Sequence, residues 1–244
     1  SGHMDGLTRR SLVCAFTPLA LNEARAQTPR VAARSETIDV DGTRRRYRLV
    51  SPPAPRNAPI VIAFHGVESS PGNMARSSRL DEAAQSEGWI LAYPGALGQR
   101  WPYFSQERTI GDVRFSDLLI SRLIELGGDP NRVHLTGMSG GGFFCNVVGS
   151  RLSERVASVA AHSGGAGFLA RDGVNATHKY PVMVIHGIDD AIVPIESGRN
   201  LAALYRQEGH AVEMIEYPRW GHQWAAPLGV NLRIADFFRR TPLS

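Results

Sequence analysis

The chain has 244 residues, which fits one α/β domain better than two small ones. Its 43% hydrophobic and 20% charged residues are typical of a globular protein with a full core, and no stretch approaches the roughly 18 apolar residues of a membrane span. The formal charge is +4, but the single dense arginine cluster, at 44–48, alternates within a strand-like stretch. A solvated strand face explains that cluster better than a nucleic-acid site, so we expect neither nucleic acid nor a membrane as partner.

The first residues are predicted to lie outside the folded domain. Residues 1–3 have the form of an expression scar. Residues 4–26 have the form of a signal peptide, with the arginine pair Arg9-Arg10, a short apolar segment at 11–21 and an Ala-Arg-Ala cleavage site at 24–26. The alternative is a disordered or loosely packed arm. The signal predicts export, to the periplasm or out of the cell, and leaves one domain at 27–244.

Cysteine usage limits both disulfides and metal sites. Cys14 falls within the predicted signal, so Cys145 is alone in the mature part and cannot form an internal disulfide. Neither a C-x-x-C pair nor a Cys/His cluster with zinc spacing occurs in the sequence. We therefore expect stability to come from the core, and we expect no metal.

The apolar periodicity predicts strands that alternate with helices. This alternation is typical of an α/β fold with a mostly parallel, doubly wound sheet and helices on both faces. The unassigned stretches at 67–76, 95–111 and 164–180 are too short for a large lid. The predicted strands are a hairpin at 35–52 that turns at Asp41-Gly42, then 58–66, 89–95, 132–137, 156–165, 181–187 and 211–218, and the predicted helices are 77–88, 112–128, 141–154, 195–209 and 229–240.

One motif stands where a predicted strand meets a predicted helix. Gly137-Met138-Ser139-Gly140-Gly141 matches G-x-S-x-G, the pattern of a nucleophile elbow. Small residues there allow a tight, strained turn that exposes the serine hydroxyl, and the following helix directs its positive end at the site. Because glycine is frequent in this chain, a chance match is expected on the order of one time in ten, so the placement between strand and helix carries the interpretation.

A serine nucleophile needs a histidine base, which in this fold follows the acid in the chain. Five histidines follow the motif. His162 and His186 are predicted at strand ends and His178 in a loop. His210 is predicted to be a solvated surface residue. His222 lies between the last strand and the last helix, over the carboxyl edge of the sheet where ligands bind, and is the predicted base.

The acid and the oxyanion hole are expected in loops at the same edge. Asp189 and Asp190 both follow the strand 181–187, and spacing alone does not decide between them. The oxyanion hole needs two N–H donors, which we expect to be the backbone amides of Gly140, after the nucleophile, and Val67, after an early strand.

Taken together, the segments around these motifs, over roughly residues 45–240, resemble secreted α/β-hydrolase esterases of the feruloyl esterase and polyhydroxybutyrate-depolymerase-like family. The family pattern His-Gly-x-x-Asp-x-x-Val-Pro, counted from His186, implies Asp190 as the acid. Its Gly-His-x-Trp pattern implies His222 and Trp224, and its G-x-S element implies Ser139 as the nucleophile. The chain departs from the family at positions near the expected pocket, so the resemblance leaves the substrate open.

The implied reaction is hydrolysis of a small-molecule or polymeric ester through an acyl-enzyme, without cofactor or metal. Feruloyl or other aromatic esters and hydroxyalkanoate oligomers are the expected substrates. Trp101 and Trp224 are predicted to line the substrate pocket, although either could instead be core packing. The alternatives are an acetyl-xylan-type deacetylase, a peptidase or thioesterase of the same fold, and a non-catalytic binding protein. The sequence makes no prediction about the oligomeric state.

Overall fold

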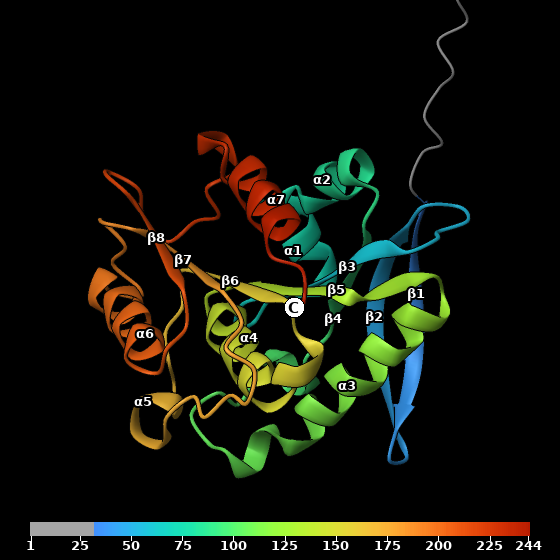
Figure 1. The fold of residues 1–244 in the computed structure, drawn as a ribbon, viewed down its shortest axis with the longest axis horizontal. Coiled ribbons are helices and arrows are strands. Elements are labelled where there is room, and N and C mark those ends of the chain that lie inside the picture. The colour runs from blue at the N-terminus through green and yellow to red at the C-terminus, as the bar shows by residue number, and fades with distance from the viewer. Residues whose placement is uncertain (1–31) are drawn as a thin grey trace, which may run out of the picture.

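The computed structural model describes residues 32–244, so the predicted expression scar and signal peptide lie outside the described residues. Eight strands form one sheet in the order β1-β2-β4-β3-β5-β6-β7-β8, and its pairs are parallel except for β1–β2 and β2–β4 (Figure 1). The strands are β1 Ala32–Val40, β2 Thr43–Ser51, β3 Ala58–Phe64, β4 Ile90–Pro94, β5 Gly128–Met138, β6 Ser158–His162, β7 Val182–Gly187 and β8 Val212–Tyr217. The helices are α1 Pro71–Ser78, α2 Leu80–Glu87, α3 Ile110–Glu125, α4 Gly140–Arg151, α5 Leu169–Asp172, α6 Ile195–Gln207 and α7 Val230–Arg240.

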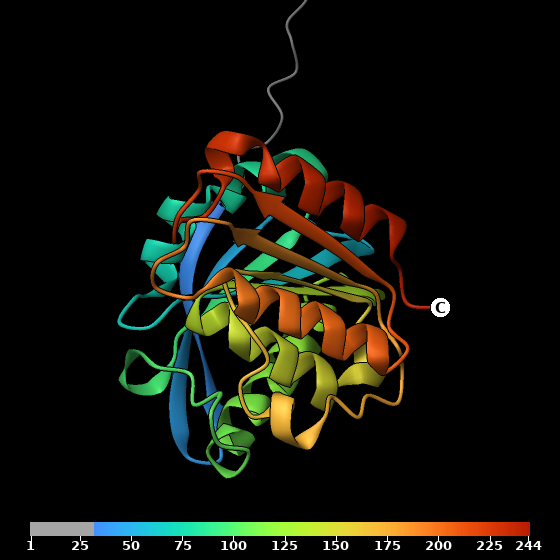
Figure 2. The same ribbon diagram turned by 90° about the vertical axis from the view of Figure 1, so that its left-hand side faces the viewer.

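Helices cover both faces of the sheet. α1, α2 and α7 lie on one face, and α3, α4 and α6 on the other (Figures 1 and 2). Successive side chains of β3 alternate between the two cores, because adjacent residues of a strand point to opposite faces: Ile60 and Ile62 belong to one, and Val61 and Ala63 to the other. The predicted fold class is confirmed, and the described chain carries no insertion large enough to be a lid domain. None of the described helices has the length and apolar character needed to cross a bilayer.

The predicted helix at 77–88 is wrong in its extent, because two helices occupy this region. α1 begins within the stretch left unassigned, with Pro71 in its first turn and the Ser70 hydroxyl accepting a hydrogen bond from the Asn73 amide. Arg79, at φ 57°, ends α1 and precedes α2. Apolar periodicity missed α1, a two-turn helix in which only Met74 and Ala75 are buried apolar residues. Similarly, the short helix α5 lies in the unassigned stretch 164–180.

The arginine cluster at 44–48 is only partly solvated. Arg44 and Arg46 are exposed, as predicted. Arg45 is buried, in an ion pair of 2.7 Å with Asp112 of α3 and with its guanidinium over the Phe115 ring. The alternation of β2 therefore directs one arginine into the core, because α3 supplies it with a carboxylate and an aromatic face.

His210 is also buried, contrary to the prediction that it is a surface residue. Only 4% of it is exposed, and its Nδ1 donates a hydrogen bond to the Tyr180 carbonyl at 2.7 Å. Its ring lies against those of Tyr180 and Tyr205. The position after a helix-ending glycine did not reveal that α6 packs on the sheet at this point.

Candidate active site

Ser139 sits at the turn between β5 and α4. Its backbone has φ 54° and ψ −118°, a conformation that side-chain-bearing residues rarely adopt. Such a conformation costs of the order of 1–3 kcal/mol and persists only where the surroundings hold it. The Ser139 amide donates to the His162 carbonyl at 3.0 Å, which ties the turn to the neighbouring strand β6.

The glycines around Ser139 allow the turn to pack against the sheet. A Cβ at Gly137 would lie 2.2 Å from the Gly141 carbonyl oxygen. A Cβ at Gly141 would lie 2.0 Å from the Phe64 carbonyl oxygen of β3. Both separations are far below van der Waals contact, so the small residues of the motif are required by the approach of α4 to the sheet.

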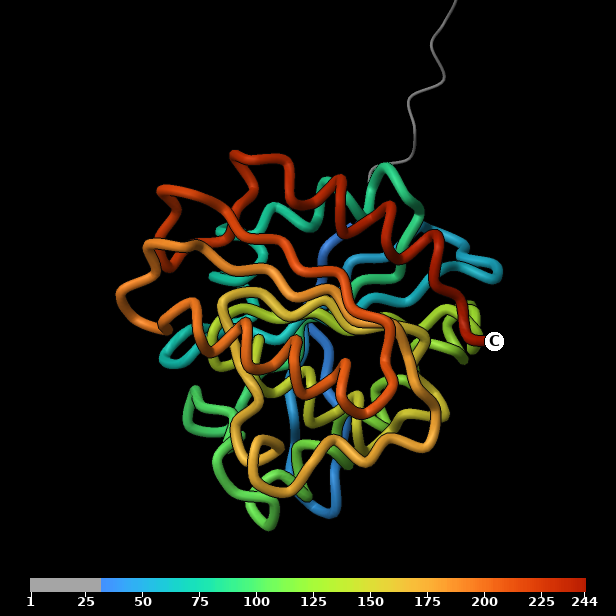
Figure 3. Tube along the Cα trace, turned by 60° about the vertical axis from the view of Figure 1, so that its left-hand side comes forward, coloured from blue at the N-terminus to red at the C-terminus, as the bar shows by residue number. Residues whose placement is uncertain are grey.

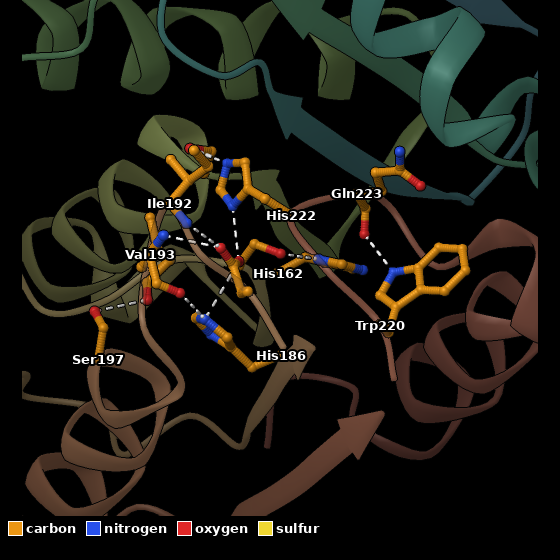
Figure 4. A network of polar contacts seen from close by, with 12 residues as sticks. His162, His186, Ile192, Val193, Ser197, Trp220, His222 and Gln223 are labelled. Atoms are coloured by element: carbon orange, nitrogen blue, oxygen red, sulfur yellow. Dashed lines mark hydrogen bonds and ion pairs between the residues drawn. The ribbon is translucent and has the colours of Figure 1, made fainter. Parts of the chain in front are cut away.

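His222 contacts both Ser139 and Asp190. Its Nε2 lies 2.9 Å from the Ser139 Oγ, and its Nδ1 lies 2.7 Å from the Asp190 Oδ2 (Figure 4). A carboxylate only accepts hydrogen bonds, so Nδ1 carries the proton and Nε2 is free to accept one from the serine. The Asp190 side chain is fully buried, whereas 19% of the His222 side chain is exposed. The structure therefore brings together the three residues that the sequence singled out.

Several donors hold the Asp190 carboxylate. Its Oδ1 accepts hydrogen bonds from the amides of Ile192 at 2.9 Å and Val193 at 2.8 Å. Burial by itself raises the pKa of Asp190, but the hydrogen bonds from His222 and the two amides outweigh burial, so the pKa lies below its usual value. Asp190 is thus an ionised partner for the His222 imidazole.

Asp189 points away from this network. Its side chain is exposed, and its amide donates to the Trp220 carbonyl at 3.0 Å. This bond links the loop after β7 to the loop after β8, which lie side by side (Figure 3). The geometry therefore decides between the two aspartates that the sequence spacing could not separate. Asp190 contacts His222, whereas Asp189 contributes only its backbone to the pairing of the two loops.

The amides of Val67 and Gly140 are close to one another and free. A Cβ placed on Gly140 would lie 3.3 Å from the Val67 nitrogen. Within the described part of the chain, neither amide N–H has a hydrogen-bond acceptor. Gly140 is buried and Val67 is half-buried. Two adjacent amides that have no acceptor and lie beside a serine suit an oxyanion.

His65 supports the loop that carries Val67. Its Nδ1 donates to the Gly66 carbonyl at 2.7 Å, and its Nε2 accepts from the Ala96 amide at 3.1 Å. Burial lowers the pKa of His65, against the opposing effect of the bond to Gly66. A neutral imidazole with both nitrogens occupied orders this loop and the one after β4.

The prediction that Trp101 and Trp224 line a substrate pocket is wrong. Trp101 is 1% exposed, stacks on Phe144 at 4.8 Å and donates its indole N–H to the His65 carbonyl at 3.0 Å. Trp224 is 4% exposed and stacks on His162 at 4.5 Å. Both rings are core packing, the alternative that the sequence left open, and each buried indole N–H has an acceptor within the protein.

Tyr103 and Phe143 provide the aromatic surface that the sequence placed elsewhere. The Tyr103 ring lies 3.6 Å from the position of a Cβ on Gly140 and stacks on Phe143 at 4.3 Å. Both rings are half-buried. We call this pair the aromatic wall. Tyr103 is two residues from Trp101, and no signal in the sequence tells which ring of that segment faces inward.

Two further buried histidines have no side-chain hydrogen bond to Ser139, Asp190 or His222. His162 accepts a hydrogen bond from the Ala225 amide at 3.0 Å, which anchors the loop of His222, and burial lowers its pKa to about 3. Burial likewise lowers the pKa of His134 to about 3. An unfolded imidazole has a pKa near 6.5, so the unfolded chain binds these protons first as the pH falls.

We therefore expect the free energy of unfolding to be highest above about pH 6.5 and to decrease as the pH falls from there toward 3. At pH 5 each of these two histidines should account for a loss of about 2 kcal/mol. Urea unfolding at pH 7.5 and pH 5.0 measures the change. His134→Gln should reduce the difference between the two pH values, and an unchanged difference would contradict the assignment.

A family model described as phospholipase/carboxylesterase matches residues 106–227. The match covers half of the chain and includes Ser139, Asp190 and His222. Among solved structures, a thermostable esterase superimposes with a TM-score of 0.70 at 18% identity, covering 88% of this chain and 64% of that one. At this identity the likeness bears on the fold alone, and it agrees with the predicted α/β-hydrolase architecture.

Curated relatives are similar at low identity. A bifunctional acetylxylan esterase/xylanase of Neocallimastix patriciarum is 26% identical over 157 residues, which cover 63% of this chain and 22% of that protein. Feruloyl esterase B of Piromyces equi is 26% identical over 151 residues, with coverages of 58% and 28%. Acyl-protein thioesterase 1 of Gibberella zeae is 27% identical over 210 residues, with coverages of 71% and 87%. The chain thus spans about a quarter of the first two proteins. The resemblance to feruloyl esterases is confirmed, whereas the polyhydroxybutyrate-depolymerase part stays a prediction.

Proposed function

Since the chain belongs to the phospholipase/carboxylesterase family, we propose that it hydrolyses carboxylic esters through an acyl-enzyme on Ser139. The observation that carries the proposal is the position of His222, whose two ring nitrogens lie within hydrogen-bond distance of a serine hydroxyl and a buried carboxylate. A serine hydroxyl becomes a nucleophile when such a base removes its proton.

Each step has a group in place. His222 Nε2 takes the proton of Ser139 Oγ as the oxygen attacks the ester carbonyl, and the ionised Asp190 stabilises the resulting imidazolium. The amides of Val67 and Gly140 donate to the oxyanion, each contributing about 3 kcal/mol at the transition state. His222 then protonates the departing alcohol oxygen. Water repeats the sequence on the acyl-enzyme, which releases the acid and restores the serine.

Esters with an aromatic acyl group are the substrates that the site favours. The aromatic wall of Tyr103 and Phe143 stands beside Gly140, where the carbonyl oxygen of the substrate would lie. The names of two relatives, a feruloyl esterase and an acetylxylan esterase, support an ester of a plant polysaccharide as the substrate. A second candidate, thioester hydrolysis, is favoured by the acyl-protein thioesterase, most of whose length aligns with this chain.

A substrate panel tests the proposal. Feruloyl, acetyl and 3-hydroxybutyrate esters, with an acyl thioester and a peptide, would be assayed beside Ser139→Ala as the blank. We expect ester hydrolysis that the blank lacks, and labelling of Ser139 by a fluorophosphonate. Cleavage of thioesters or peptides alone would contradict the proposal, and a serine that neither reacts nor supports hydrolysis would identify a non-catalytic binding protein.

Tyr103→Leu tests the aromatic wall. Stacking of aromatic rings contributes about 0.5–1.5 kcal/mol beyond burial, so kcat/KM for a feruloyl ester should fall by about two- to twelvefold. An acetyl ester has no ring to stack, and its kcat/KM should change less than twofold. Phe104→Leu, at a neighbouring ring that is 60% exposed, is the matched control. Equal losses on both esters would mean that Tyr103 only supports the loop.

A further inference from the structure

A large cavity lies beside the loop that carries Val67, and the proposed reaction does not use it. It has a volume of about 800 Å³, within the usual range of ligand sites. It opens between the β1–β2 hairpin, the loop after β3 and the loop after β4, and neither Ser139 nor His222 lines it. We call it the arginine groove. Its lining residues are 33–35, 44–48, 65, 69–72, 95–97 and 99.

The hairpin forms one wall because it extends past the neighbouring strand. Tyr47 pairs with Pro94, the last residue of β4, so residues 43–46 of β2 project beyond the carboxyl edge of the sheet (Figure 1). Side chains alternate along this extension. Arg45 is directed into the core beneath α3, and Arg44 and Arg46 lie exposed on the opposite face.

The lining of the groove carries a net positive charge. The charged residues among those that line the groove are all arginines, with no aspartate or glutamate. Three of them pair with carboxylates from outside the lining: Arg34 with Glu36, Arg45 with Asp112 and Arg48 with Asp81. Arg44 and Arg46 have no carboxylate within ion-pair distance in the described part of the chain. Two guanidinium groups are therefore left without an ion pair, with Arg44 opposite Asp39 and Arg46 opposite Thr37 in the β1–β2 pairing.

The wall opposite the hairpin contains neutral hydrogen-bond donors, and a short turn connects it to the site of Ser139. Ser69, Ser70 and Gly72 line the groove at the amino end of α1, which favours negative charge. The Ser69 amide donates to the Gly66 carbonyl at 3.3 Å, and a Cβ on Gly66 would lie 3.5 Å from the Ser139 Cβ. One tight turn therefore separates the groove wall from the nucleophile, close enough for one substrate to reach both.

We propose that the arginine groove binds a carboxylate group of the ester substrate, located at a distance from the ester bond that is cleaved. This inference rests on the proposed function and narrows its substrate class to acid-bearing esters. A guanidinium binds a carboxylate through two parallel hydrogen bonds, and an exposed pair of arginines can do so without the cost of burying a charge. The carboxylate is the free end of an oligoester or a uronic acid of a polysaccharide, two sources with the same recognition chemistry.

Matched substrates that differ only in charge test the groove. A linear 3-hydroxybutyrate trimer would be compared as its free acid and as its terminal primary amide, and a feruloylated oligosaccharide with and without a uronic acid. For at least one pair we expect kcat/KM to be about tenfold higher for the acid, mainly because its KM is lower. Adding 0.5 M salt should reduce this ratio. The pair that shows the preference identifies the source of the carboxylate.

Arg44→Gln/Arg46→Gln should bring this preference close to one and leave kcat/KM on the neutral member of each pair within twofold. Arg206→Gln removes an exposed arginine of α6, beside β7 and β8, and should leave the preference intact. Equal rates on both members of both pairs in the unmodified protein, or a preference that survives the double substitution, would overturn the inference. If the double variant folds poorly, which its rate on the neutral esters reveals, each single substitution should lower the preference by about threefold.

The failure of this inference differs from the failure of the proposed function. If the unmodified protein hydrolyses neutral esters, Ser139→Ala does not, and acids are not preferred, then the groove is rejected as a carboxylate site. The proposed esterase function would still stand. If no ester is hydrolysed, calorimetric binding of the trimer acid to Ser139→Ala still tests the groove. That binding should weaken about tenfold in the Arg44→Gln/Arg46→Gln background, and unchanged binding would reject the site.

Discussion

Replacing Ser139 with alanine is expected to lower kcat for ester hydrolysis by about a millionfold. The loss is large because the acyl-enzyme cannot form, and His222 and Asp190 then have no hydroxyl to activate. The amides of Val67 and Gly140 remain, so a residual rate of about a thousandfold over the water reaction should persist. Steady-state rates at high enzyme concentration measure the loss. A decrease of less than a hundredfold would mean that Ser139 is not the nucleophile.

The strained backbone of Ser139 adds a stability test to the same position. Alanine keeps the cost of φ 54° and ψ −118°, whereas glycine adopts this conformation readily. Ser139→Gly should therefore be equally inactive but about 1 kcal/mol more stable than Ser139→Ala in urea unfolding. Ser86, exposed on α2, is the matched control, since there glycine should be less stable than alanine by about 0.5–1 kcal/mol. The same order of stability at both positions would contradict the assignment of strain.

Asp190→Asn should lower kcat by about ten-thousandfold. The amides of Ile192 and Val193 hold Oδ1, so an asparagine would keep its carbonyl oxygen there and present its NH₂ group to His222. Two donors cannot face each other, and the imidazole would carry its proton on Nε2 instead. A protonated Nε2 cannot accept the Ser139 proton, so the base would be lost while the packing stayed unchanged.

Asp189→Asn is the matched control, one residue away. Its side chain is exposed and only its backbone takes part in the loop pairing, so kcat should change less than twofold. The two variants would be compared in kcat and in urea unfolding. A large loss in Asp189→Asn with a small loss in Asp190→Asn would reverse the assignment of the acid.

Local patterns in the sequence predicted most of the elements and the order in which the site residues occur. Strand and helix periods reflect which side chains must be buried, so the alternating fold followed from them. The G-x-S-x-G motif was readable because a tight turn between strand and helix excludes larger residues, which the contacts of Gly137 and Gly141 bear out. The signal peptide at 4–26 lies outside the described residues and stays a prediction.

Contacts between distant segments were beyond such patterns. The choice between Asp189 and Asp190 depended on which carboxylate meets a histidine 32 residues away, and only the family resemblance had favoured Asp190. The Trp101 side chain is buried where the His65 carbonyl accepts its indole N–H. The Arg45 side chain is buried where a carboxylate of α3 pairs with it.

The sequence by itself determined the α/β alternation, the elbow at Ser139 and the loop that carries His222, because these follow from local burial and backbone freedom. The tertiary structure alone decided which aromatic rings face the site and which arginines stay free. Tyr103 stands beside Gly140, and Arg44 and Arg46 line a groove, because separate segments of the chain meet there. A side chain's exposure is a property of its neighbours, and these neighbours are distant in the sequence.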